Sequence, residues 1–401
     1  MKSLITSTYN QLDNWIDKNG PMSYDVSDIK AQAIYIWIIN FSQKSKFTKI
    51  LTAPAILLAE NYTNFLRKVF IIKKKIYPQG QAVLARAYLA HYKLSKNKDS
   101  LDKALKALDW LKQNPSIGYN KYCWGQPYNW YSRKLIPANI PRATVTSQVA
   151  NAFLDAYEVI KEEEYLEIAI EACNFFIENL KWQEDEDGFI CFSYTSVDNY
   201  NIHNASMLAA AVLIRTWFYS KIGKFKEFGI KAMNFTIKHQ NEDGSWFYWA
   251  PPDKIIGKID NYHTGFVLES LEVIKKYTVG GFDLDHTINK GLEFYLKNLF
   301  VDNSIPKMTN KSIYPIDIQS CAQAIITLGE MKSGNPVLEK IANEIAKWTI
   351  ENMIDEKGFF YFRIYKNGRI DKTPYIRWSE SWMLRALTFL LDKNPDTNEN
   401  I

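Results

Sequence analysis

Residues 203–217 read HNASMLAAAVLIRTW, and small or apolar side chains occupy most positions of this stretch. A helix that is apolar almost all round is buried on most of its sides. Five further segments share this character, at residues 79–92, 144–157, 262–274, 318–328 and 379–391. We expect all six segments to form buried helices.

A second kind of segment alternates with the first. Each of these segments is amphipathic, with one apolar face and one charged face, which predicts a helix that faces solvent. They span residues 100–112, 163–180, 224–239, 287–299 and 336–353. Buried and exposed helices are therefore expected to follow one another along the chain.

The buried segments recur at a nearly constant spacing. They begin near residues 79, 143, 202, 260, 317 and 377. A regular period of roughly 60 residues is typical of a repeat architecture. The sequence predicts an all-α fold, an (α/α)6 toroid, over residues 1–401 as a single domain. We expect residues 1–50 to form a helical extension packed on it, residues 53–70 to supply the sixth outer helix, and residues 29–41 to pack alongside.

The connections from outer to inner helices carry short aromatic runs after glycine turns. Examples are DGFICF at 187–192, DGSWFYW at 243–249 and KGFFYF at 357–362. A glycine turn followed by such a run predicts a short strand or hairpin. Because each outer helix runs opposite to its inner partner, these loops should all emerge at one end of the toroid. We call this end the rim.

Aromatic and polar side chains gather at the predicted rim. An aromatic-lined cavity with a few converging polar groups is typical of a small-ligand or glycan site. The candidate substrate-binding residues are Trp124, Tyr128, Trp130, Arg133, His203, Asn204, Trp246, Asn261, Gln319, Arg363, Arg377 and Trp378. Flat aromatic faces suit sugar rings, and the arginines would bind an anionic group such as a uronic acid carboxylate.

The stretch IDNYHTGF at 259–266 is the best candidate for the chemistry. Asp260 and His263 lie three positions apart at the start of a predicted helix, so they share one face. Asp317 and Glu380 follow at equivalent places one and two repeats later. Carboxylates beside a histidine in a desolvated site can supply a general acid and base. The same carboxylates could instead cap helices, and the rim aromatics could simply plug the toroid.

Composition argues against several other classes of function. The net charge of +5 comes from 49 basic and 44 acidic residues spread along the chain, which does not favour nucleic-acid binding. The longest apolar run, 31–41, is too short to span a membrane. The cysteines Cys123, Cys173, Cys191 and Cys321 lack metal-binding spacing. We therefore expect a cytoplasmic protein with reduced thiols, no metal and no cofactor.

Several motifs together resemble the polysaccharide-biosynthesis-associated α/α-toroid proteins, which are often labelled delta-aminolevulinic acid dehydratase. The matching residues are Tyr24-Asp25, Cys123-Trp124-Gly125, Trp130 to Arg133, Thr144 to Ser147, Asp260 to Phe266, Arg377-Trp378 and Trp382-Met383. The resemblance implies a six-hairpin glycosidase-like toroid, similar to those of glycoside hydrolases, uronyl hydrolases, polysaccharide lyases and glucuronyl C5-epimerases. It also implies a place in polysaccharide metabolism, without a particular reaction. Dehydratase activity is not expected, because that enzyme type resembles a TIM barrel and no strand-helix alternation is present here.

A second resemblance concerns triterpene cyclases. The stretch QNEDGSW at 240–246 is similar to their QxxDGSW repeat, and DLDHT at 283–287 is similar to their acidic DxDDT motif. Here His286 interrupts the acidic run, and the repeat pattern places the segment at the start of an outer helix. We interpret the likeness as shared toroid architecture.

Three functions remain as hypotheses. The first is a carbohydrate-active enzyme that acts on an anionic or amino-sugar oligosaccharide or polysaccharide by hydrolysis, elimination or epimerisation. The second is a non-catalytic glycan-binding component of a polysaccharide biosynthesis system. The third is a terpene cyclase or prenyltransferase-like protein, which would need its acidic motif inside an apolar cavity.

Overall fold

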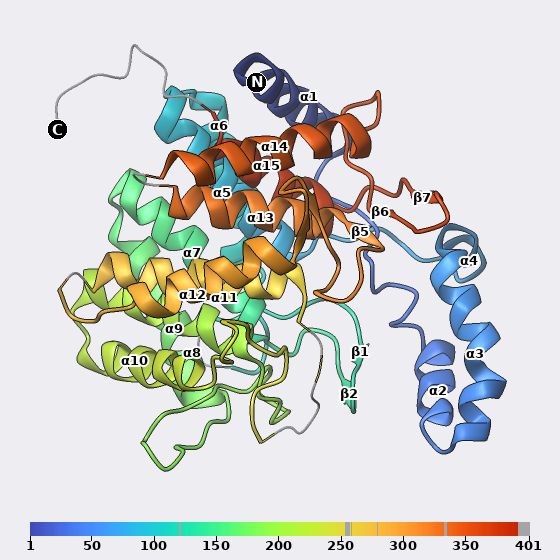
Figure 1. Ribbon diagram of the computed structural model, residues 1–401, viewed down its shortest axis with the longest axis horizontal. Helices are drawn as coiled ribbons and strands as arrows, with labels where there is room; N and C mark the ends of the chain where they lie inside the picture. The colour runs from blue at the N-terminus through green and yellow to red at the C-terminus, as the bar shows by residue number, and fades with distance from the viewer. Residues whose placement is uncertain (120–121, 253–256, 258, 279, 333–334, 392–401) are drawn as a thin grey trace.

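Within the described residues, six mostly buried helices form a closed inner ring. The computed structural model describes residues 1–401 except 120–121, 253–256, 258, 279, 333–334 and 392–401. The inner helices are α5 (Pro78–Ser95), α7 (Ala143–Ile160), α9 (His203–Ser220), α11 (Asn261–Tyr277), α13 (Ile318–Met331) and α15 (Ser381–Thr388). Each contacts the next, and α15 returns to contact α5 (Figure 1). The predicted (α/α)6 toroid is confirmed.

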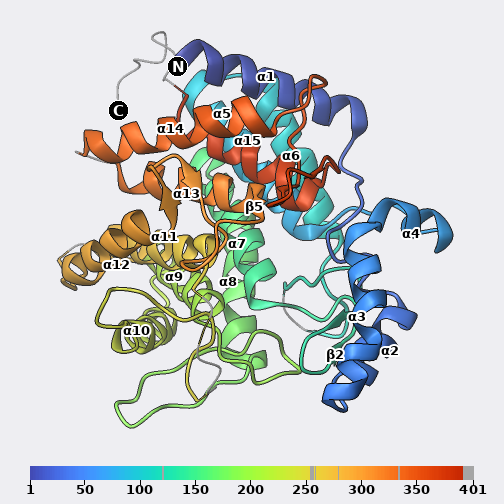
Figure 2. The same cartoon turned by 45° about the vertical axis from the view of Figure 1, so that its right-hand side comes forward.

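An outer helix packs beside each inner helix. Five of these are α6 (Lys98–Gln113), α8 (Glu163–Asn179), α10 (Gly223–Lys238), α12 (Asp285–Asn298) and α14 (Pro336–Met353). The sixth is α1 (Lys2–Asn19), which contacts α15 and sends Ile5, Tyr9, Leu12 and Ile16 into the main core (Figure 2). The start of the chain therefore completes the outer ring.

The expectation that residues 53–70 supply the sixth outer helix is wrong. These residues belong to α3 (Lys46–Asn61) and α4 (Thr63–Val69). Together with α2 (Ala33–Ser42) they pack on a small separate cluster built from Ile29, Tyr35 and Ala59. Figure 1 shows α2, α3 and α4 standing at one edge of the molecule, beside the toroid.

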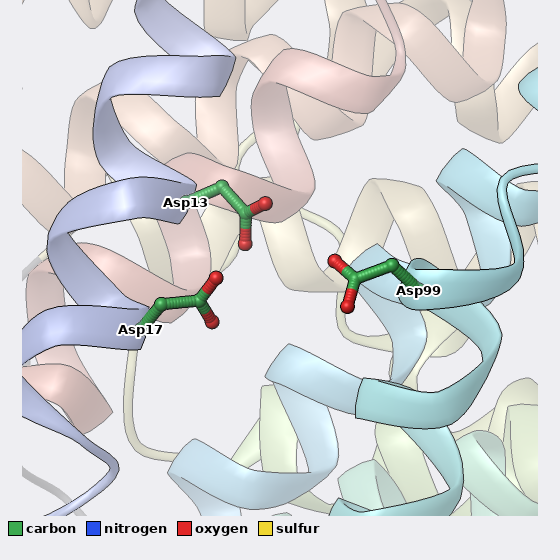
Figure 3. A group of neighbouring side chains, drawn as sticks. All are labelled: Asp13, Asp17 and Asp99. Carbon is green, nitrogen blue, oxygen red and sulfur yellow. The ribbon is translucent and has the colours of Figure 1, made fainter.

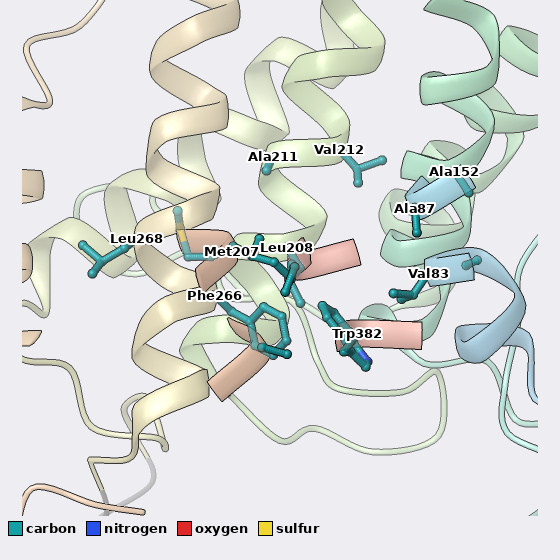
Figure 4. Close-up of a cluster of buried hydrophobic side chains, with 14 of the residues drawn as sticks. Val83, Ala87, Ala152, Met207, Leu208, Ala211, Val212, Phe266, Leu268 and Trp382 are labelled. Atoms are coloured by element: carbon teal, nitrogen blue, oxygen red, sulfur yellow. The ribbon is translucent and has the colours of Figure 1, made fainter. Parts of the chain in front are cut away.

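The core lies between and within the two rings. Alanines such as Ala87 and Ala152 let neighbouring inner helices approach closely, and larger side chains fill the remaining space (Figure 4). Phe266 of α11 meets Trp382 of α15 edge to face, with 5.5 Å between ring centroids. Burial of one such large apolar side chain stabilises the fold by about 1.5–3 kcal/mol. The near-continuous apolar character of the inner segments is explained by contacts on nearly all sides.

Three successive inner helices end in the same way. Lys96, Lys161 and Lys221 follow α5, α7 and α9 with φ of 56°, 66° and 57°, and each backbone N–H bonds to a carbonyl of the last turn. A left-handed residue satisfies carbonyls at a helix end, and a lysine favours the negative end of the helix dipole. These caps carry the helices about one turn past their predicted ends.

Short antiparallel strands lie in the loops that lead from outer to inner helices. β1 (Trp130–Tyr131) pairs with β2 (Leu135–Ile136), and β3 (Phe300–Val301) pairs with β4 (Ile305–Pro306). β6 (Arg363–Ile364) pairs with both β5 (Ile316–Asp317) and β7 (Ile370–Asp371), with Asp317 opposite Arg363. The predicted hairpins at 187–192 and 357–362 form isolated bridges, Glu184 to Ile190 and Ile354 to Phe360. The strands therefore lie at the rim, but mostly not in the expected loops.

The described structure places all four cysteines in buried positions, and no disulfide joins them. Burial raises the pKa of the Cys123, Cys173 and Cys321 thiols to about 12, so they stay protonated at neutral pH. Across the part of the chain that the structure describes, no helix is both long enough and apolar enough to cross a bilayer.

Candidate functional site

Within the described residues, a cavity lies at each end of the inner ring. One cavity, of about 220 Å³, is lined by the C-terminal halves of the inner helices, including Arg86, Asp155, Arg215, Glu269 and Arg385. We call it the basal cavity. The other, of about 270 Å³, is lined by the first turns of the inner helices and by the rim loops. We call it the rim cavity.

Ion pairs satisfy most of the charges of the basal cavity. Arg86 Nε lies 2.8 Å from Asp155 Oδ2, and Arg215 Nη2 lies 2.6 Å from Asp155 Oδ1. Arg385 Nη2 lies 2.7 Å from Glu269 Oε1. Burial alone would raise the pKa of Asp155, but Arg215 and Arg86 hold that pKa below its usual range. We interpret this network as a structural link between inner helices.

The rim cavity is lined by aromatic and polar side chains. The aromatic ones are Tyr128, Trp130, Tyr194, Tyr248, Tyr262, Phe266 and Trp378. The polar ones are Ser27, Gln79, Gln126, Arg142, Thr144, Gln148, Asn204, His263, Gln319 and Arg377. No aspartate or glutamate is among the described residues that line it. The cavity is therefore rich in rings and hydrogen-bonding groups but poor in carboxylates.

Several lining side chains have buried polar atoms with no hydrogen-bond partner among the described residues. They are Gln126 Oε1, Arg142 Nε and Nη2, Asn204 Oδ1, and both amide atoms of Gln319. Among the described residues that line the basal cavity, only Ser270 Oγ and Arg385 Nη1 are buried without a hydrogen-bond partner. Buried polar groups are normally hydrogen-bonded, so a polar ligand in the rim cavity would satisfy these atoms. The rim cavity is therefore the candidate site.

Asp260 and His263 form a hydrogen-bonded pair at the start of α11. Asp260 caps the helix by accepting a hydrogen bond from the backbone N–H of His263, at 3.1 Å. Its second oxygen lies 2.8 Å from Nδ1 of His263. The carboxylate is buried, whereas the imidazole is 21% exposed and lines the rim cavity. Because Asp260 engages Nδ1, Nε2 is the ring nitrogen left for a ligand.

Two tyrosines flank this histidine. The ring centroids of Tyr248 and Tyr262 lie 4.6 Å and 4.2 Å from that of His263. Burial raises the pKa of both phenols well above its ordinary value, and nearby acidic groups add to the effect. Both phenols therefore stay protonated near neutral pH and can donate a hydrogen bond or a proton.

Arg142 supplies a buried cation to the cavity. It is the residue before α7, and its guanidinium lies 5.2 Å from the ring centroids of both Tyr128 and Trp130. Two of its nitrogens, Nε and Nη2, have no hydrogen-bond partner among the described residues. Arg142 belongs to the loop residues that the sequence places at the rim, but it is absent from the predicted substrate-binding residues, although it immediately precedes an inner helix, as Asp260 does. That equivalent position is the signal that could have identified it.

Seven of the residues predicted from the sequence do line the rim cavity. They are Tyr128, Trp130, Asn204, His263, Gln319, Arg377 and Trp378. Arg377 is already paired, because its Nη2 lies 2.9 Å from Asp25 Oδ1 and its Nη1 donates to Gln79. Its guanidinium is therefore less available to a ligand than that of Arg142.

The other predicted carboxylates lie behind the cavity wall. Asp317 caps α13 and accepts hydrogen bonds from Arg363 Nε at 2.6 Å and from Trp378 Nε1 at 2.9 Å. Glu380 is fully buried and accepts a hydrogen bond from the backbone N–H of Phe360. Burial raises the pKa of Glu380 to about 8. The expectation that Asp317 and Glu380 face the cavity is wrong, because backbone and arginine partners hold both carboxylates inside the protein.

Two predicted tryptophans face the outer ring. Trp124 donates its indole N–H to the carbonyl of Leu111 in α6, and Trp246 donates to that of Thr236 in α10, both at 2.9 Å. Both side chains are buried and neither lines the rim cavity. The expectation that they line the mouth is wrong, because each indole instead bonds to an outer helix near its C-terminal end.

The remaining predicted residues lie near the cavity without lining it. Asn261 bonds to Leu299 and Tyr295, and His203 is buried beside Thr236. Burial lowers the pKa of His203 to about 3, so it is neutral. The exposed Arg133 stacks on Trp249, with 4.1 Å from its guanidinium carbon to the ring centroid.

The acidic stretch similar to terpene cyclases lies at the outer ring. Asp283 bonds to the backbone of Asp285, where α12 begins. Neither residue lines the rim cavity. The arrangement that a terpene cyclase would need, an acidic motif inside an apolar cavity, is therefore not built by the described residues.

One group of carboxylates has a spacing that could suit a metal ion. Asp13 and Asp17 of α1 face Asp99 of α6 (Figure 3). Lys103 Nζ lies 2.9 Å, 2.6 Å and 2.9 Å from oxygens of these three residues, in that order. Lys103 thus bonds to all three carboxylates, so the cluster ties α1 to α6 through the lysine.

No family model and no curated protein matches this chain. Solved structures resemble it in fold. The unsaturated glucuronyl hydrolase of a Bacillus species is 12% identical, with a TM-score of 0.65, over 97% of both chains. Cellobiose 2-epimerase from Bacillus thermoamylovorans is 12% identical, with a TM-score of 0.63, over 79% of this chain and 87% of that one. An α-mannanase from Bacteroides thetaiotaomicron is 14% identical, with a TM-score of 0.58, over 78% and 85%. These likenesses establish the fold.

Proposed function

We propose that this protein is a carbohydrate-active enzyme that removes a proton beside the carboxylate of a uronic acid residue, leading to elimination or epimerisation. One observation carries the proposal. His263, held at Nδ1 by Asp260, lines a cavity that also contains the unpartnered guanidinium nitrogens of Arg142. A base and a carboxylate-binding cation in one cavity suit proton abstraction next to a carboxylate.

Hydrolysis by two carboxylates is less well supported. Most glycoside hydrolases place a pair of aspartates or glutamates across the glycosidic bond. The rim cavity has no such residue among the described residues that line it, and Asp317 and Glu380 are enclosed behind its wall. Of the three reactions considered, elimination and epimerisation fit the lining groups better.

The proposed roles follow from the lining. Nε2 of His263 accepts the proton from the ring carbon that bears the carboxylate, and Asp260 stabilises the imidazolium that forms. Arg142 binds the carboxylate and stabilises the negative charge that develops on it. In elimination, Tyr248 or Tyr262 protonates the departing glycosidic oxygen as a carbon-carbon double bond forms. In epimerisation, a tyrosine returns a proton to the opposite face. Trp130 and Trp378 provide stacking surfaces for sugar rings.

The similar structures support the sugar class. One is named a glucuronyl hydrolase responsible for degradation of glycosaminoglycan, and another a cellobiose epimerase. The resemblance to polysaccharide-biosynthesis-associated proteins supports a role in polysaccharide metabolism, and we also propose a cytoplasmic location. The whole chain would act as one domain around the rim cavity.

A substrate screen tests the proposal. The protein is incubated with polygalacturonate, alginate, heparosan and hyaluronan, and ultraviolet absorbance follows the unsaturated product of elimination. In parallel, NMR in heavy water follows exchange of the proton at the carboxylate-bearing carbon. We expect one of the two signals with the native protein and its loss in His263→Ala. Binding of a uronate polymer without either signal would instead support the non-catalytic hypothesis.

A further inference from the structure

The segment α2–α4 carries a concentration of exposed apolar side chains. Of 22 large hydrophobic residues that are exposed within the described chain, 12 lie between residues 34 and 71. They are Ile34, Trp37, Phe47, Ile50, Leu51, Leu57, Leu58, Tyr62, Phe65, Val69, Phe70 and Ile71. An exposed apolar patch of this kind commonly marks a surface that binds a partner or a membrane.

The orientation of α3 explains the patch. Its exposed apolar residues Phe47, Ile50, Leu51, Leu57 and Leu58 recur at helical spacing and form one stripe, with Phe47 and Ile50 74% and 75% exposed. The buried side chains of this helix lie on a different face, and they are Thr48, Thr52 and Ala59. The more apolar side of α3 is thus turned away from the protein, the opposite of an ordinary surface helix.

Basic residues are concentrated in the same part of the chain. The stretch 29–77 contains nine basic residues and one acidic residue, Glu60, whose side chain pairs with Lys30 at 3.1 Å. The exposed lysines are Lys30, Lys44, Lys46, Lys49, Lys68, Lys73, Lys74 and Lys75. The partner that this surface fits is therefore both apolar and anionic.

Polar contacts fix the segment on the toroid. The buried Arg67 of α4 donates to Asp28 at 2.9 Å and to the hydroxyl of Tyr375 at 2.8 Å. Arg369 donates to Asn61 at 2.9 Å. The outward stripe of α3 takes no part in this attachment. The stripe is therefore held in place by contacts that other residues make, and it remains available to a partner.

We propose that α2–α4 docks on an anionic membrane surface without spanning it. Apolar side chains would enter the boundary between headgroups and acyl chains, and the lysines would contact anionic headgroups. A second copy of this chain fits less well, because a symmetric contact through the same face would bring both sets of lysines together. The proposal does not depend on the reaction proposed above.

The docked orientation would place the rim cavity near the bilayer. Figure 1 shows α2–α4 on the same side of the molecule as β1–β2 and β5–β7, which belong to the rim. The hydroxyl of Tyr131, next to the cavity residue Trp130, lies 3.3 Å from Asn40 Oδ1 and 3.4 Å from Gln43 Oε1. A glycan presented at the membrane surface would then lie close to the site.

Vesicle sedimentation tests the proposal with the full chain. Vesicles of phosphatidylcholine and phosphatidylglycerol in equal parts should bind the protein, less so as salt rises, and vesicles of phosphatidylcholine alone should bind it weakly. The double variant Phe47→Ser, Ile50→Ser should lose more than about tenfold in affinity. The triple variant Lys73→Gln, Lys74→Gln, Lys75→Gln should lose at least about tenfold, together with part of the salt dependence.

Matched variants elsewhere serve as controls. Ile117→Ser with Val337→Ser removes exposed apolar side chains, and Lys106→Gln with Lys340→Gln and Lys347→Gln removes the same number of lysines. Thermal unfolding confirms that each variant is folded. Equal losses in test and control variants, or no binding to anionic vesicles, overturn the proposal. Concentration-dependent dimerisation that Phe47→Ser, Ile50→Ser abolishes, without vesicle binding, assigns the face to a second copy instead.

Discussion

The imidazole of His263 and the carboxylate of Asp260 are joined at 2.8 Å through Nδ1 and Oδ2, and the same carboxylate caps the helix that carries the histidine. One buried aspartate thus sets both the start of α11 and the orientation of the ring. A cap and a catalytic orienting group are usually considered as alternatives for a carboxylate at a helix start. Here the two roles fall on different oxygens of one side chain.

Substitution of Asp260 by asparagine separates these roles. Asparagine also caps helices, so we expect the stability of the fold to change little. The amide cannot stabilise a positively charged imidazole, and kcat for the proposed reaction should fall by roughly 10²–10⁴. Steady-state kinetics and urea unfolding measure the two effects. Asp243→Asn, in the turn of another rim loop, is the matched control and should keep full activity. An active Asp260→Asn variant would remove the dyad from the mechanism.

Arg142 should determine affinity for the carboxylate of the substrate. Its unpartnered nitrogens face no competing acid among the described lining residues, so Arg142→Gln should raise KM for a uronate substrate by about 10- to 100-fold. Arg142→Lys keeps the charge but loses the planar fork, and should recover only part of the affinity. Calorimetry with glucuronate gives a second readout. Arg133→Gln, at an exposed arginine outside the cavity lining, should bind as the native protein does, and equal effects of the two glutamine variants would contradict the assignment.

The sequence predicted the toroid because its signal is distributed over the whole chain. Each inner helix packs on nearly all sides, so apolar residues recur regardless of local detail. The placement of α1 was missed because its amphipathic pattern looks like that of any surface helix. The position of α3 was misjudged because its exposed stripe is apolar and its buried face carries Thr48 and Thr52. From the sequence alone, such a pattern predicts an outer helix whose apolar stripe packs against the inner ring.

The candidate site was predicted only in part. Helix periodicity gives the position of a residue along an inner helix, which brought His263, Asn204 and Gln319 to one end. It does not tell which way an indole in a loop turns, and Trp124 and Trp246 turn toward outer-helix carbonyls. Helix periodicity also does not show that Asp317 and Glu380 have hydrogen-bond partners behind the wall of the rim cavity. Those choices depend on contacts between distant parts of the chain.

Lys103 should behave as an internal counterion for α1 and α6. Burial opposes its charge, but hydrogen bonds to Asp17, Asp99 and Asp13 raise the pKa of Lys103 above its usual range. We expect magnesium or calcium to leave the Tm of the native protein unchanged. Lys103→Ala should lower the Tm and make it rise when calcium is added, because three carboxylates then lie together without a cation. Lys106→Ala, at an exposed lysine of the same helix, is the control. A calcium response in the native protein would show that the lysine is not the resident cation.

Glu380 should make the fold less stable as the pH rises. Burial raises its pKa in the folded protein to about 8, from an ordinary value near 4.5, so the folded chain holds this proton over a range where the unfolded chain has released it. The proton favours folding, and the contribution declines from pH 4.5 toward pH 8. Glu380→Gln removes the ionisable group, retains an acceptor for the N–H of Phe360, and should stabilise the protein by up to about 3 kcal/mol at pH 7 but not at pH 4. Urea unfolding at both pH values measures the difference, with the exposed Glu351→Gln as the control. A gain that is the same at both pH values would mean that folding does not raise the pKa of this carboxyl. A loss of activity in Glu380→Gln would mean that the residue contributes to the candidate site.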